Sequence, residues 1–133
     1  MVLKANPAPA AFAGHFPGRS PVEAYGNGGF RFAGMSHRGS ILCLPSGVWA
    51  WDVFTTDDVS LAQLARALSE LESPEFLLLG TGRQQVFPSF DIRRAFEVKR
   101  VGLEIMDTGA AARTYNILLA ERRPVSTALI AVD

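Results

Sequence analysis

Two short turns rich in glycine and threonine contain the residues whose types and spacing could bind a ligand. Gly80-Thr81-Gly82 follows one apolar run, and Asp107-Thr108-Gly109 follows another. In an open α/β sheet, ligands bind beyond the carboxyl ends of the strands, so both turns would face one crevice if their strands are neighbours. A helix that begins near Thr108 would point free amide groups and its positive dipole end into this crevice, with Arg113 within two turns of that end.

This arrangement predicts a site for a small anion, either a carboxylate or a phosphate. The candidate binding residues are Thr81, Gly82, Thr108, Arg113 and Asn116. A helix terminus contributes about 0.3–1 kcal/mol and a charge-assisted hydrogen bond about 1.5–3 kcal/mol, which together give binding on the order of millimolar or weaker. The structural alternative is that Asp107 or Thr108 caps the helix and that Arg113 pairs with a carboxylate.

Other kinds of site find little support in the sequence. Gly80-Thr81-Gly82 lacks the third glycine of a dinucleotide-binding loop, and no lysine follows it at P-loop spacing. Cys43 lies in an apolar run that is typical of a buried strand, with His37 six residues before it. One cysteine and two histidines are too few to favour a metal site. We therefore expect no catalytic residue, no metal and no cofactor; for an enzyme, Asp107 would be the best acid–base candidate.

The two turns belong to a second half in which strands and helices alternate. Residues 75–79 are almost wholly apolar, which is typical of a central parallel strand. The pattern then predicts a helix at 91–100, a strand at 103–106, a helix after Thr108 and a last strand at 125–132. This β-α-β-α-β alternation implies right-handed crossovers and a sheet covered by helices on both faces.

The first half is rich in short strands with antiparallel connections. Strands are predicted at 22–25, 41–44 and 48–53. The tetrapeptide Gly26-Asn27-Gly28-Gly29 predicts a tight hairpin turn. Residues 61–71 then carry leucines at helical spacing, and Ser60 with Gln63 fits a capping box, so we expect an amphipathic helix here.

Length, composition and charge further limit the classes of protein to which this chain can belong. The 133 residues suit one domain, and a hydrophobic content of 48% excludes disorder over most of the chain. Thirteen basic residues balance thirteen acidic ones, which gives no general attraction to nucleic acid or to an anionic membrane. No apolar run approaches the ~20 residues of a membrane span.

Residues 1–20 predict a flexible tail before one domain at 21–133. The expected location is cytoplasmic, or mitochondrial if this tail is a transit peptide.

Several of these motifs together resemble the Mth938-type domain family. They are the Gly80-Thr81-Gly82 turn, the run 104–108 (EIMDT), the run 113–116 (RTYN) and the strand with Gly47 and Trp51. The resemblance covers about residues 22–132 and implies a three-layer α/β domain with a mixed central sheet. The family includes mitochondrial complex I assembly factor 3 and the adipogenesis-associated Mth938 domain-containing protein, and no settled enzymatic activity comes with it.

The resemblance implies a protein-interaction or assembly factor whose partner is a subunit or assembly protein of a respiratory complex. A homo-oligomer is also allowed. Phe30, Phe32, Trp49 and Trp51 could supply one or two exposed aromatic side chains at an interface, with core packing as the use of most. The alternatives are a small-anion or metabolite-binding domain at the crevice, or an unrecognised enzyme.

Two residues depart from the pattern that this resemblance leads us to expect. Ala112 stands where cysteine is expected, so no thiol chemistry is required at that position. Arg122 stands where glycine is expected beyond the end of a helix, which leaves open how that helix is capped.

Overall fold

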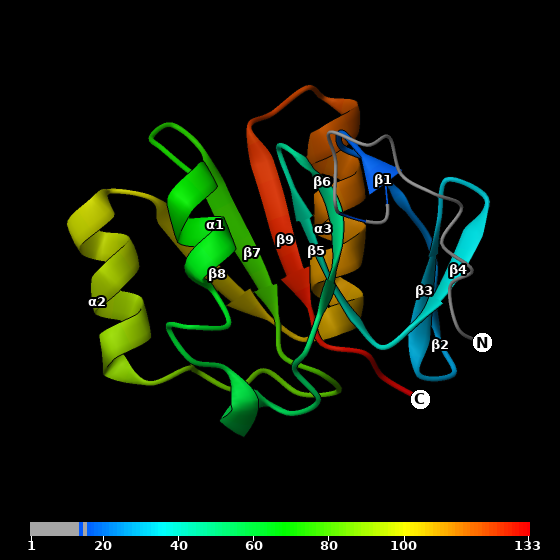
Figure 1. Cartoon of the computed structure of the whole chain (residues 1–133), viewed down its shortest axis with the longest axis horizontal. Coiled ribbons are helices and arrows are strands. Elements are labelled where there is room, and N and C mark those ends of the chain that lie inside the picture. The colour runs from blue at the N-terminus through cyan, green and yellow to red at the C-terminus, as the bar shows by residue number, and fades with distance from the viewer. Residues whose placement is uncertain (1–13, 15) are drawn as a thin grey trace.

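Short strands dominate the computed structural model, which describes residue 14 and residues 16–133 (Figure 1). The strands are β1 (Phe16–Pro17), β2 (Val22–Gly26), β3 (Gly29–Phe32), β4 (Met35–Arg38), β5 (Ser40–Leu44), β6 (Gly47–Trp51), β7 (Phe76–Gly80), β8 (Gly102–Met106) and β9 (Val125–Leu129). The helices are the 3-10 helix η1 (Thr56–Asp58), α1 (Ala65–Glu70), α2 (Phe90–Lys99) and α3 (Thr108–Ala120). Most of the predicted tail lies outside the described residues. Its described end contacts the domain, because Phe16 of β1 pairs with Val48 of β6.

Six strands form the main sheet, in the order β1-β6-β5-β9-β7-β8. β7 runs parallel to both of its neighbours, with Phe76 opposite Val125 of β9 and Gly102 of β8. β5 is antiparallel to both β9 and β6, so the sheet is mixed as predicted. Residues 77–79 of β7 are buried, because helices or strands cover both faces of this central strand.

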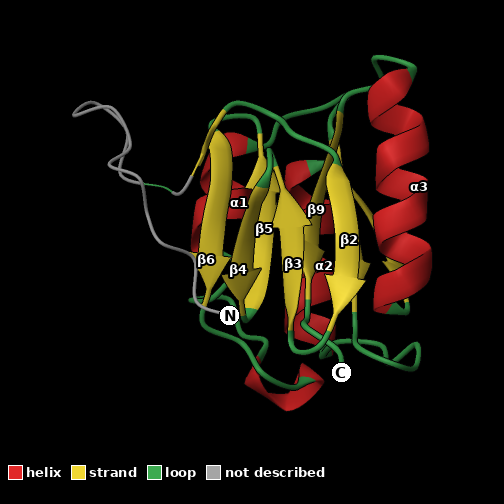
Figure 2. Ribbon diagram, turned by 90° about the vertical axis from the view of Figure 1, so that its right-hand side faces the viewer, coloured by secondary structure: helices red, strands yellow, loops and turns green. Residues whose placement is uncertain are grey.

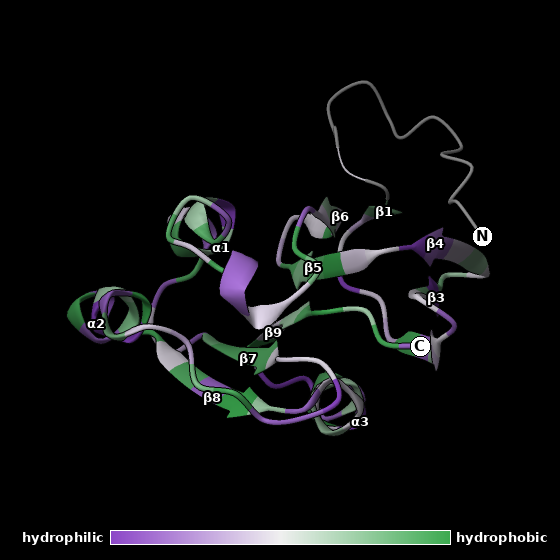
Figure 3. Ribbon diagram, turned by 90° about the horizontal axis from the view of Figure 1, so that it is seen from below, coloured by the Kyte–Doolittle hydropathy of each residue, from purple (hydrophilic) through white to green (hydrophobic). Residues whose placement is uncertain are grey.

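The main sheet is the middle of three layers, which confirms the predicted architecture (Figures 2 and 3). α1 and α2 cover one face, where Leu77 and Phe96 belong to one apolar core. α3 and the small sheet β2-β3-β4 cover the other face, where Phe32, Leu78 and Tyr115 belong to a second core. Leu77 and Leu78 are successive residues in different cores, because neighbouring side chains of a strand point to opposite faces.

The predicted hairpin turn joins β2 to β3. Asn27 and Gly28 have φ angles of 52° and 77°, and a type I′ turn requires positive φ at both central positions. The turn aligns Tyr25 with Phe30 across the pair, and β4 then continues the small sheet with His37 opposite Phe30.

α1 is shorter than the helix that the leucine spacing predicts for residues 61–71. The expected cap forms, since the Ser60 hydroxyl accepts the Gln63 N–H at 3.2 Å. However, the Leu64 N–H lies 3.2 Å from the Leu61 carbonyl, and the Ala65 N–H contacts the carbonyl three residues before it. The Leu64 N–H also lies 3.1 Å from the Ser60 carbonyl. This first turn therefore mixes bonds to the third and fourth preceding residues, and the regular α-helix begins only at Ala65.

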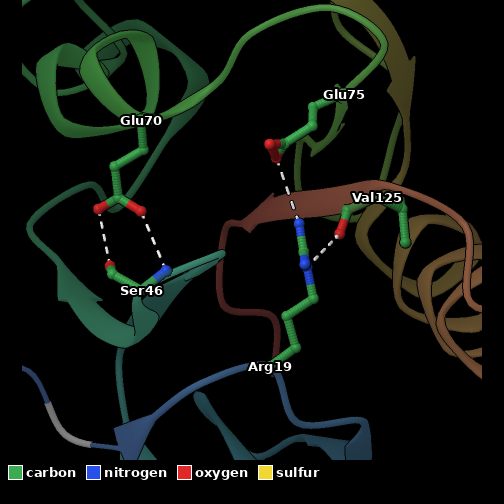
Figure 4. Close-up of polar contacts among 5 residues, drawn as sticks. All are labelled: Arg19, Ser46, Glu70, Glu75 and Val125. Atoms are coloured by element: carbon green, nitrogen blue, oxygen red, sulfur yellow. Dashed lines mark hydrogen bonds and ion pairs between the residues drawn. The ribbon is translucent and has the colours of Figure 1, made fainter.

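Polar contacts fasten the amino-terminal ends of the central strands (Figure 4). Arg19 donates from Nε to the Val125 carbonyl of β9 and from Nη2 to the Glu75 carboxylate just before β7, both at 3.2 Å. Nearby, the Glu70 carboxylate accepts the Ser46 N–H at 3.0 Å and the Ser46 hydroxyl at 2.7 Å. The Arg19 contacts tie the segment before β2 to strands that come much later in the chain, and the Glu70 contacts tie the turn between β5 and β6 to α1.

α3 ends in a Schellman motif that lacks the expected glycine. Arg122 has a φ of 60°, and its N–H donates to the Leu119 carbonyl at 2.9 Å. The Arg123 N–H donates to the Leu118 carbonyl, also at 2.9 Å. The two bonds satisfy carbonyls of the last helical turn, so the helix is properly capped. The left-handed conformation of Arg122 costs about 1–2 kcal/mol relative to an ordinary helical one.

Candidate functional site

The two glycine–threonine turns meet at one end of the sheet, as predicted, because β7 and β8 are neighbours. The Gly82 N–H donates to the Thr108 hydroxyl at 2.9 Å, and the Thr108 N–H donates to the Gly82 carbonyl at 2.8 Å. The Thr108 hydroxyl in turn donates to the Ile130 carbonyl at 2.7 Å, and the side chain is fully buried. These polar groups are therefore paired with one another inside the protein.

The Thr81 hydroxyl organises the loop that follows β7. It lies 2.6 Å from the Gln84 carbonyl and accepts the Val86 N–H at 3.0 Å. Its backbone N–H donates to the Met106 carbonyl of β8 at 2.9 Å. Thr81 thus has a structural use in holding the loop of residues 81–86 in shape.

Asp107 caps the start of α3, which confirms the structural alternative for this residue. Its side chain accepts the Ala110 N–H at 2.9 Å, and its carbonyl accepts the Ala111 N–H at the same distance. The carboxylate places a negative charge at the positive end of the helix dipole. A second anion at this helix start would meet that charge, so the N-terminus of α3 is a poor anion site.

Arg113 and Asn116 hold β2 against α3. The Arg113 guanidinium lies beside Gly109 of the second turn, but its hydrogen bond goes to β2. The Asn116 side-chain carbonyl accepts the Val22 N–H at 2.8 Å, and its amide donates to the Val22 carbonyl at 2.7 Å. Arg113 donates from Nη1 to the Tyr25 hydroxyl at 2.9 Å, so its partner is a phenol and not the expected carboxylate. The five predicted residues are therefore divided among three places, and anion binding by them stays a prediction that this geometry does not favour.

A crevice of about 620 Å³ does lie beside the turns, with Thr81 and Gly82 in its wall. Arg38 and Arg83 line it as well, and neither takes part in an ion pair within the described residues. The sequence predicted Arg113 as the cation of this crevice, but Arg38 and Arg83 line it instead. Arg83 directly follows the Gly-Thr-Gly turn in the sequence, so its place in the crevice could have been predicted. Arg38 is distant from the turn in the sequence, and only the folded structure brings it to the crevice.

An exposed surface rich in apolar side chains lies between α2 and β8, at a place that the sequence pattern did not indicate. Val86, Phe87 and Phe90, which we call the aromatic rim, are 43%, 63% and 69% exposed. Next to the rim is a cavity of about 380 Å³, which we call the edge groove. It is lined by Phe87, Arg93, Phe96, Glu97, Val101, Leu103 and Ile105. Phe87 thus belongs to both the rim and the groove, whose wall is apolar apart from the charged side chains of Arg93 and Glu97.

The aromatic residues singled out from the sequence lie elsewhere. Phe30, Phe32 and Trp51 are buried in the two cores. Trp49 is half-buried and lies on the same face as Trp51, with the Arg66 guanidinium 3.4 Å from the centre of its ring. Core packing therefore accounts for most of them, as expected. The most exposed aromatic side chains are instead Phe54, which precedes η1, and Phe87 and Phe90 near α2.

A family described as a protein of unknown function (DUF498/DUF598) matches residues 22–130 of the chain. The chain belongs to this family. Within it, the chain is 36% identical over 115 residues to an uncharacterised protein of Rhodobacter capsulatus, spanning 86% of this chain and 87% of that protein. It is 32% identical over 111 residues to a Xenopus tropicalis protein named NADH dehydrogenase (ubiquinone) 1 alpha subcomplex assembly factor 3. That match spans 82% of this chain but 60% of the frog protein.

Several solved structures share the fold of this chain. A Bartonella henselae protein described as an outer membrane protein has a TM-score of 0.83 at 47% identity, over 90% of this chain and all of that one. A Bordetella pertussis protein described as a Mth938-like domain has a TM-score of 0.71 at 34% identity, over 98% and 92% of the two chains. The resemblance to the Mth938-type family is thereby confirmed. No helix in the described part of this chain has the length and apolarity to cross a membrane.

The titratable groups buried in this DUF498 domain are held neutral. Burial raises the pKa of the Cys43 thiol to about 12, so the thiolate that a nucleophile requires is not formed near neutral pH. Burial also raises the pKa of Tyr115, whose hydroxyl donates to the Ser20 carbonyl at 3.1 Å. Among the described residues, no three histidine, cysteine or acidic side chains converge as metal ligands.

Proposed function

We propose that this chain binds a protein partner through the aromatic rim and the edge groove, and that it thereby assists assembly of a membrane-bound NADH dehydrogenase. The exposure of Phe87 and Phe90, with Phe87 also in the wall of a largely apolar groove, carries the proposal, because such a surface is unfavourable in water and typical of an interaction site. The names of the vertebrate relatives support the assembly role. The proposal assumes a cytoplasmic location, which fractionation of the host checks.

The size of this face suits a partner that binds and later leaves. Burying the exposed parts of Phe87 and Phe90 contributes about 2–4 kcal/mol before the cost of association is subtracted. A permanent subunit has a larger and more apolar interface. An assembly factor must be released when the complex is complete, so a moderate contribution from two anchor side chains fits that role.

The test is made in the native host. We expect deletion of the gene to lower the amount of assembled NADH dehydrogenase, measured by native gel electrophoresis and by NADH oxidation in isolated membranes. The double variant Phe87→Ser/Phe90→Ser should leave the same defect. The matched control is Ile117→Ser on α3, where the side chain is 59% exposed on the opposite face of the sheet, and it should restore assembly.

Two results would contradict the proposal. An unchanged amount of the complex after deletion removes the assembly role. Full restoration by the Phe87→Ser/Phe90→Ser variant removes the aromatic rim as the binding surface, even if the assembly role stands.

A further inference from the structure

β8 forms an open edge of the main sheet. It pairs with β7 on one side, and the sheet order ends with it. The Met106 carbonyl accepts the Thr81 N–H, so Gly102, Glu104 and Met106 are the residues whose backbone groups face β7. Because alternate residues of a parallel strand bond to opposite sides, the backbone groups of Leu103 and Ile105 point away from the sheet. Unpaired groups of this kind are a template for another strand.

Among the described residues, the Gln85 side chain is hydrogen-bonded to this edge. The Gln85 amide donates from Nε2 to the Ile105 carbonyl at 2.9 Å, and Gln85 is exposed. This bond confirms that the Ile105 carbonyl faces outward. It is an exposed contact that an incoming backbone N–H can replace with little loss, since a net hydrogen bond is worth about 0.5–1.5 kcal/mol.

The edge groove lies on the face of β8 to which the side chains of Leu103 and Ile105 point. Leu103 and Ile105 line the groove together with Phe96 of α2, and they pack against the same apolar core. A strand added next to β8 would direct every second side chain toward this groove and the others toward the opposite face. The backbone would supply affinity and the groove would select apolar side chains.

The strand added to β8 could come from a second copy of this chain or from a different protein, and the charge at the centre of β8 favours the different protein. Glu104 is the middle residue of the strand, is exposed and has no ion-pair partner among the described residues. In a symmetric antiparallel pair of two copies centred on this residue, the register that pairs all five residues of β8, each Glu104 would stand opposite the other, and like charges directly opposite destabilise a sheet. A segment with lysine or arginine on that face would instead form a favourable cross-strand pair.

We propose that β8 accepts an extended segment of a partner protein as an additional strand, with apolar side chains in the edge groove and basic side chains beside Glu104. This inference rests on the proposed function and names the kind of partner that its surface takes. The segment alternates apolar and basic residues and binds by its backbone, so its recognition requires no folded domain on the partner side.

The test uses the full chain and two capped synthetic peptides of about eight residues, which is an ordinary strand length. One alternates valine with lysine, and the other alternates valine with glutamate. We expect the lysine peptide to shift the backbone NMR signals of residues 102–106 and to slow hydrogen exchange at the Leu103 and Ile105 amides. The glutamate peptide should bind about threefold more weakly for each charged pair that is reversed.

The variant Glu104→Lys should invert the order of the two peptides, whereas Glu72→Lys, an exposed control in the loop before β7, should not. Absence of binding at millimolar peptide, signal changes confined to other elements, an unchanged order in Glu104→Lys, or dimers joined through residues 102–106 would each overturn the inference. If the lysine peptide binds at β8 but gene deletion leaves the NADH dehydrogenase intact, the edge site stands and the assembly role fails.

Discussion

Replacing Thr108 with valine tests whether this residue is structural or reserved for a ligand. The hydroxyl accepts the Gly82 N–H and donates to the buried Ile130 carbonyl, and the side chain has no exposure to solvent. Valine has nearly the same shape but makes neither bond. Each bond contributes about 0.5–1.5 kcal/mol, and a buried group left unpaired costs about 1–3 kcal/mol. We therefore expect Thr108→Val to lower the free energy of unfolding by about 2–4 kcal/mol, a large part of the ~5–15 kcal/mol of a typical domain.

The assay is urea unfolding followed by circular dichroism, with the midpoint and the slope fitted separately. Thr108→Ser keeps the hydroxyl and should recover most of the loss. Thr114→Val, at a partly exposed position of the same helix, controls for the change in helix propensity and should cost little. If Thr108→Val lowers the free energy of unfolding no more than Thr114→Val does, the reasoning is refuted. The Thr108 hydroxyl would then again be a group that could bind a ligand.

Four further predictions concern stability and reactivity. Asn116→Ala leaves both polar groups of Val22 without their partner, so the free energy of unfolding in urea should fall by about 2 kcal/mol. Arg122→Gly relieves the positive φ at the end of α3 and should raise the free energy of unfolding by about 1 kcal/mol, seen as a higher melting temperature. The Cys43 thiol should resist iodoacetamide in the native protein at pH 8 and react after unfolding, because burial raises its pKa to about 12. The stability linked to this raised pKa is fully present below the usual pKa of 9.0 and is lost as the pH rises toward 12. Between these pH values, the free energy of unfolding should therefore fall less in Cys43→Ala than in the natural protein.

The layers and the parallel part of the sheet could be predicted because their signals are local. The apolar run at 77–79 indicates a strand that is covered on both faces, and alternation with two helices then requires parallel neighbours. The hairpin at Asn27-Gly28 is equally local, since the turn type depends on two residues. In contrast, the first turn of the predicted helix at 61–71 has the right spacing but a different winding, which periodicity does not distinguish.

The candidate site could be predicted only in part, because its contacts join distant segments. Asn116 bonds to Val22, 94 positions earlier in the chain, and Arg113 bonds to Tyr25, 88 positions earlier. No helical pattern near residue 113 indicates that a strand of the small sheet lies against it. The edge groove escaped prediction for the same reason, because it depends on β8 being last in the sheet, and strand order is a property of the whole fold.

The position of β9 has a consequence for when the protein can fold. β9 lies between β5 and β7, so β1, β6 and β5 connect to β7 and β8 in the main sheet only through it. Among the described strands, it is also the last to leave the ribosome. Until Leu129 emerges, the nascent chain consists of two incomplete sheets with open edges, which are exposed to aggregation. The domain therefore completes its fold only after nearly all of it has been synthesised, and it depends on protection of those edges until then.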